Sequence, residues 1–123
     1  MVNEATTLRH ARFDIAEKTR KVELLETMIR DFTSTAANLA REIGAEEERT
    51  RIKDPNHVAY STLAKALAIR RGKLLMSAAD AEMRLLAARC EVDEATAMAS
   101  REVEAAAGSM MEFGRVARLL TLQ

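Results

Sequence analysis

The stretch IKDPNHVAYSTLAKAL, residues 52–67, holds the single proline of a 123-residue chain whose flanking sequence has the composition of helix. Proline cannot donate a backbone hydrogen bond and disfavours helical geometry at the residue before it. Asp54 followed by Pro55 is a common helix start, and Ser61 offers a second one. The stretch therefore predicts a corner over about residues 52–60, with a new helix starting at either point.

Upstream of this corner, apolar residues recur every seven positions, which is typical of a coiled-coil seam. We expect a first helix over about residues 5–51. One row of its seam is Leu8, Ile15, Val22, Ile29, Ala36 and Ile43, and the other is Ala11, Lys18, Leu25, Phe32, Leu39 and Glu46.

Downstream of the corner, a second seam is built mainly from alanine and leucine, which lets two helices approach closely. We expect this helix over about residues 61–107, because Gly108 and Gly114 weaken helix beyond it. Arg71 interrupts one row, and the methionines at 28, 76, 83 and 98 are interpreted as fillers of gaps along the seam. The rows are Leu67, Leu74, Ala81, Ala88 and Ala95, and Ala64, Ala78, Leu85, Val92, Ala99 and Ala106.

Charge favours folding back into an antiparallel pair. A basic block at residues 9–21 would then meet an acidic block at residues 90–102, and the acidic residues 42–48 would meet the basic residues 65–73. Opposite charges beside a seam set its direction more than its stability. We therefore expect an all-α protein, a long antiparallel two-helix coiled-coil hairpin forming a single domain.

The expected pairing leaves an apolar C-terminal extension, about residues 108–123, beyond the start of the first helix. It is interpretable as a frayed tail, a self-association surface or a hook for a partner, and we favour the hook. Its candidate contact residues are Met110, Met111, Phe113, Val116, Leu119 and Leu120.

The sequence gives little support for catalysis. Formal net charge is zero, which gives no reason to expect nucleic acid as a partner. One cysteine and two histidines, far apart, argue against a metal site. No phosphate-binding loop or paired nucleophile is present, so we expect no enzyme activity and no cofactor. Without a signal peptide or an apolar span, we expect a cytoplasmic protein.

Residues 41–88 resemble the central part of FliJ-type flagellar export proteins. The resemblance rests on EIGAEEERTRIKDP (42–55), on HVAY (57–60), and on AKA (64–66) followed by paired arginines at 70 and 71. It implies a cytoplasmic coiled coil of the flagellar type III export apparatus, associated with the inner face of the cell membrane only through its partners.

The same resemblance implies the partners. They are the export ATPase ring, the cytoplasmic domain of the export gate and, for some members, export chaperones. Residues 8–25 and about 95–120 would face the ring. The corner would offer a second contact site at Asp54, Pro55, His57, Tyr60, Arg70 and Arg71, although a solvated surface is the alternative for the two arginines.

Two other functions remain open. An unrelated helical-hairpin adaptor or chaperone would bind a client helix through its apolar C-terminal tail. A transcription regulator would insert an acidic coiled-coil tip into RNA polymerase, but the second domain or zinc site usual in such proteins is missing. The sequence also leaves the oligomeric state open, because the same seam can pair between chains.

Overall fold

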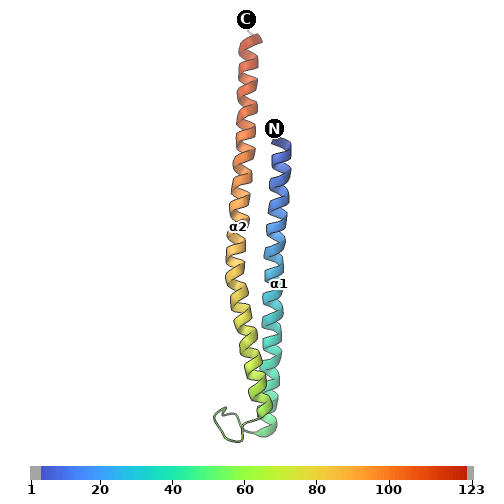
Figure 1. The fold of residues 1–123 in the computed structure, drawn as a ribbon, viewed down its shortest axis with the longest axis vertical. Coiled ribbons are helices and arrows are strands. Elements are labelled where there is room, and N and C mark those ends of the chain that lie inside the picture. The colour runs from blue at the N-terminus through green and yellow to red at the C-terminus, as the bar shows by residue number, and fades with distance from the viewer. Residues whose placement is uncertain (1–3, 122–123) are drawn as a thin grey trace. The chain divides into compact units, whose positions relative to one another are not determined.

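The computed structural model describes residues 4–121, which form two α-helices and contain no strand. α1 spans Glu4–Thr50, α2 spans Thr62–Thr121, and residues 51–61 link them. The two helices pack against each other in opposite directions (Figure 1), so the prediction of an all-α helical hairpin is confirmed.

The chain forms two compact units. The corner unit, residues 23–86, contains the second part of α1, the linking loop and the first part of α2. The terminal unit contains the first part of α1, up to Val22, and α2 from Ala87 onward.

The core of the corner unit is the predicted seam. Alanine lets the two backbones approach, and leucine fills the space between them. Two further residues of the predicted seam of α1, the bulky Phe32 and the charged Glu46, are half-buried. The buried residues are Leu25, Ala36, Leu39, Tyr60, Ala64, Ala78, Ala81 and Leu85.

In the terminal unit, the buried seam residues of α2 are alanines. Ala88 and Ala95 of α2 are buried, and the facing residues of α1 are half-buried. Lys21 Nζ lies 3.7 Å from Glu91 Oε2, between the two helices. The pKa of Lys18 is raised, mainly by its hydrogen bond to Asp14 and further by Glu91 and Glu94. One ion pair therefore joins the expected basic and acidic blocks, whereas Lys18 and Arg20 pair with Asp14 and Glu17 of their own helix.

The helix bounds settle one alternative and correct one prediction. α2 begins at Thr62, so Ser61 rather than Asp54 precedes the long helix. The prediction that helix two ends near residue 107 was wrong, because α2 continues to Thr121. Each glycine in a helix costs about 1 kcal/mol relative to alanine, but the residues around Gly108 and Gly114 are mostly strong helix formers and include no proline.

Candidate functional site

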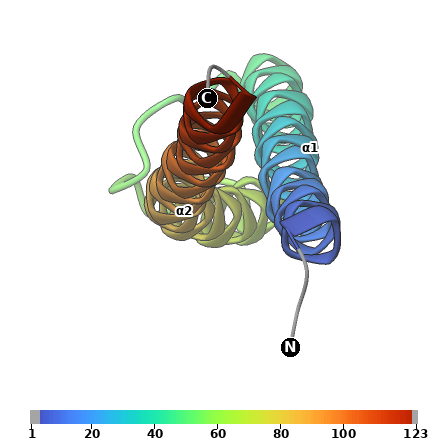
Figure 2. The same cartoon turned by 90° about the horizontal axis from the view of Figure 1, so that it is seen from above.

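The first candidate surface is the corner, and its backbone path is set by local hydrogen bonds. α1 ends at Thr50, and the next residue, Arg51, has a left-handed φ of 63° and an N–H that donates to the Glu47 carbonyl at 2.8 Å. A left-handed residue just past the last turn is the usual way to stop a helix. The loop that follows stands out beside the start of α2 (Figure 2).

Asp54 and His57 order this loop. Asp54 Oδ1 accepts a hydrogen bond from the Asn56 N–H at 3.0 Å, and the Asp54 carbonyl accepts one from the His57 N–H at 3.0 Å. His57 Nδ1 in turn accepts from the Ala59 N–H at 2.9 Å. Both side chains therefore satisfy loop amides, as aspartate commonly does in turns.

Tyr60 anchors the loop to the helices. Its exposed fraction is only 7%. Burial raises the pKa of the Tyr60 hydroxyl, and the nearby carboxylate of Glu47, to which it is hydrogen-bonded, raises it further. The ring is thus a core residue of the corner unit, whereas the sequence had placed it among the candidate contact residues.

A cluster of three side chains joins the end of α1 to the start of α2. Ser61 Oγ donates a hydrogen bond to Glu46 Oε1 at 2.8 Å and accepts one from the Ala64 N–H at 3.2 Å. Arg49 holds the same carboxylate through Nη2 at 2.6 Å and Nε at 3.1 Å. The Arg49 guanidinium and the Ser61 hydroxyl lower the pKa of Glu46 to about 2. We call Glu46, Arg49 and Ser61 the corner latch.

The latch corrects the expected charge pairing near the corner. Glu46 pairs with Arg49 of its own helix and Glu48 pairs with Lys53 of the loop at 2.9 Å, instead of with the cations of residues 65–73. A short ion pair within one turn costs less side-chain ordering than a pair across the seam. Sequence alone could not separate the two sets of cations, because Arg49 and Lys53 are near these glutamates in the chain and residues 65–73 are near them in the expected hairpin.

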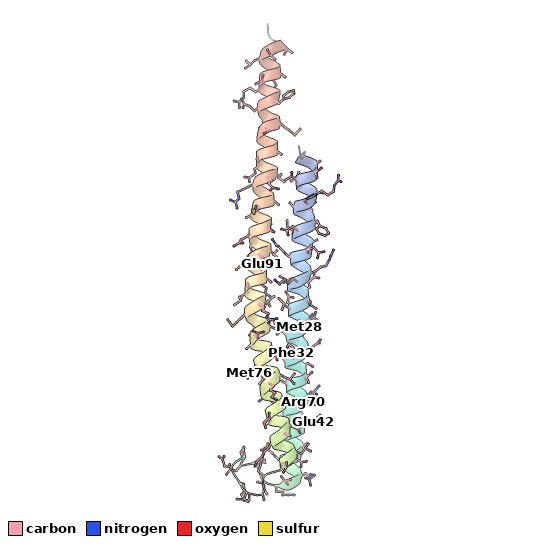
Figure 3. The ribbon with its side chains drawn as sticks, viewed as in Figure 1. Met28, Phe32, Glu42, Arg70, Met76 and Glu91 are labelled. Carbon is pink, nitrogen blue, oxygen red and sulfur yellow. The ribbon has the colours of Figure 1, made fainter. Side chains whose placement is uncertain are left out.

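Most of the corner loop is open to solvent, because residues 53–59, including Asp54 and His57, are all exposed. Pro55 and Val58 are exposed, and the Val58 side chain makes no close contact, with an exposed fraction of 101%. Sequence reasoning missed Val58, for which the signal was a β-branched apolar residue inside a polar loop. Arg70 and Arg71 are also exposed on the first part of α2, and Figure 3 shows Arg70 near the height of Glu42 on α1.

The second candidate surface is the C-terminal part of α2, in the terminal unit. All six apolar residues predicted there are exposed and helical. Continuing the heptads of α2 beyond Ala106 places Phe113, Val116 and Leu120 in the rows that pack on α1 earlier in the helix. We call these three residues the open seam, because residues 4–22 of α1 cover the rows only as far as about Ala106.

Nothing in the described residues points to small-molecule chemistry. A shallow hollow of about 360 Å³ lies between the helices of the terminal unit, beside His10, Ala95 and Glu102. Residues 4–121 contain no group of three His, Cys, Asp or Glu that could hold a metal ion. Neither helix, over the same residues, has a stretch long and apolar enough to cross a membrane.

Comparisons of this chain with protein-family models, with curated proteins and with solved structures give no significant match.

Proposed function

We propose that this protein is a non-enzymatic coiled-coil component of the flagellar type III export apparatus, located in the cytoplasm at the inner face of the cell membrane. It would couple or regulate the export ATPase and the export gate by helix-mediated contacts. The resemblance of residues 41–88 to FliJ-type proteins supports this class of function, and the helical hairpin is compatible with it.

The open seam is the observation that supports partner binding most strongly. Phe113, Val116 and Leu120 occupy heptad positions, yet all three are exposed. A helical partner that lies along these rows would extend the α1–α2 seam without any change in the backbone of α2. Met110 and Leu119, at the flanks of the rows, would widen the apolar contact.

The corner offers the second contact in this proposal. Pro55 and Val58 are exposed on a loop whose C-terminal end is anchored by the buried Tyr60 and by the hydrogen bond from Ser61 to Glu46. A preordered loop loses little conformational entropy on binding. We assign this loop, with Arg70 and Arg71, to the export gate or a chaperone, and the open seam to the ATPase ring.

A binding assay with the purified export ATPase of the same organism tests the proposal, with ATP turnover measured in parallel. The full chain is compared with a variant truncated after Ala107. We expect the full chain to bind and alter turnover, and the truncated chain to do neither. If the full chain fails to bind at about 10 µM, the proposed function is contradicted and the adaptor alternative is favoured.

A further inference from the structure

α2 carries a second apolar seam on the face that points away from α1. In the corner unit, Ile69, Met76 and Met83 repeat every seven residues, and Gly72, Ala79 and Leu86 follow each of them by three. All six residues are exposed, and none is charged. We call these six residues the outer seam. Their spacing of three and four over nearly three heptads is the pattern of a coiled-coil interface.

This finding corrects the interpretation of the methionines as gap fillers along the α1–α2 seam. Met76 and Met83 have exposed fractions of 74% and 73%, and Met98 is also exposed, whereas Met28 is half-buried. Met76 also lines an open hollow with Met28 and Phe32 of α1, together with the charged side chains of Asp80 and Arg84. A surface helix with only one partner would carry polar residues here.

The outer seam is self-complementary when two copies run antiparallel. If Ile69 faces Leu86 of the second copy, the heptad geometry of antiparallel helices fixes which of the other seam residues face each other. Gly72 then faces the second copy's Met83, and Ala79 faces its Met76. Each small residue is thus opposite a flexible large one, and the two-fold axis repeats every contact. A parallel pair would instead oppose Gly72 to Gly72 and Ala79 to Ala79, leaving gaps.

Charge at the edge of the seam agrees with the same register. Lys73 and Asp80 lie on one flank of the outer seam, and both are exposed. In the antiparallel register, Lys73 of each copy lies beside Asp80 of the other, which gives two symmetric ion pairs around the central layer. Asp80 also pairs with Arg84 of its own helix at 3.2 Å, and a carboxylate can accept from both cations.

We propose that the protein forms an antiparallel homodimer through the outer seam, which brings two hairpins together as a four-helix arrangement around Met76 and Ala79. The proposal goes beyond the proposed function, because it concerns a different face of α2 and a second copy of this chain rather than an export component. It leaves the open seam free for another partner.

Sedimentation of the full chain over about 1–100 µM tests the proposal. We expect a concentration-dependent dimer, and the double variant Met76→Glu/Met83→Glu should raise its dissociation constant at least about 100-fold, because carboxylates would be buried against apolar groups. Met111→Glu, at an equally exposed methionine outside the seam, should leave the constant unchanged. Unchanged helicity by circular dichroism shows that each variant folds.

A charge exchange tests the register. Lys73→Asp and Asp80→Lys should each raise the dissociation constant about threefold or more, because like charges would face each other, and the double variant should restore it. A monomer at all concentrations would overturn the proposal. So would a dimer insensitive to the methionine variants, since it would use another face, and a charge exchange without recovery, which would contradict the antiparallel register.

Discussion

Individual residues at the corner decide where the two helices stop and start. The turn is ordered by Asp54 and His57, closed by the Ser61 hydroxyl and pinned by the buried Tyr60 ring. Asp54, His57 and Ser61 each accept a hydrogen bond from a backbone N–H that a reversing chain would otherwise leave unpaired, and Tyr60 contributes buried apolar area. Of the candidate contact residues at the corner, only Tyr60 is buried in the core, whereas Asp54 and His57 order the loop and stay exposed.

The latch makes stability dependent on pH in a defined direction. The pKa of Glu46 is lowered to about 2 from an ordinary value of 4.5. Its contribution is therefore complete above about pH 4.5 and is lost as pH falls toward 2. We expect Glu46→Gln to lower the urea midpoint at pH 7, and the difference from the unaltered chain to shrink steadily below about pH 4.5. A difference that stays constant down to pH 2 would contradict the assigned role.

Ser61 also caps α2, and its removal should be measurable alone. We expect Ser61→Ala to destabilise the chain by about 0.5–2 kcal/mol, the usual cost of losing a helix cap. Ser77→Ala, at an exposed position within α2, serves as the control and should change stability little. Urea unfolding followed by circular dichroism gives both values, and equal midpoints for the two variants would exclude the cap.

Arg51 adopts a left-handed backbone, which favours glycine over a residue with a side chain. We expect Arg51→Gly to raise the free energy of unfolding by up to about 1 kcal/mol. Arg49→Gly, inside the last turn of α1, should instead destabilise the chain, because it removes a latch residue and adds glycine to a helix. Thermal melts of the two variants should therefore shift in opposite directions.

At the scale of the helices, the heptad rows predicted from sequence match the observed burial closely. Even Lys18 and Glu46, which are charged, are half-buried where the repeat places them. The end of α2 was less predictable, because two glycines weaken a helix without ending it unless a turn or a proline follows. The heptad spacing of the outer seam is also visible in the sequence, but Met76 and Met83 were interpreted as fillers of the α1–α2 seam.

Packing along the seam should be strongly position-dependent. Leu39 is buried between the helices, whereas Leu24 is exposed on the same helix. We expect Leu39→Ala to destabilise the chain by about 2–5 kcal/mol and Leu24→Ala by well under 1 kcal/mol. Urea unfolding of both variants, measured at one protein concentration, checks this contrast. Similar losses for both would contradict the assigned seam.

At the scale of the molecule, α2 presents apolar residues to three different surroundings. Its seam residues pack on α1, the open seam continues these rows without a partner, and the outer seam lies on another face of the helix. The hairpin could be predicted from sequence, because periodicity and charge are local properties of the chain. The exposed apolar residues near the C-terminus could be predicted too, because α2 is longer than α1, whereas the outer seam was missed because its methionines were assigned to the α1–α2 seam.

The most direct test of the proposed function is a titration of the export ATPase with two single-residue variants, Phe113→Glu and Met111→Glu. The two residues are almost equally exposed, at 77% and 74%, but only Phe113 belongs to the open seam; Met111, a candidate contact residue from sequence, lies outside the heptad rows. We expect Phe113→Glu to weaken binding at least about tenfold and Met111→Glu to leave it unchanged. Equal affinities for both variants and the unaltered chain would contradict binding through the open seam.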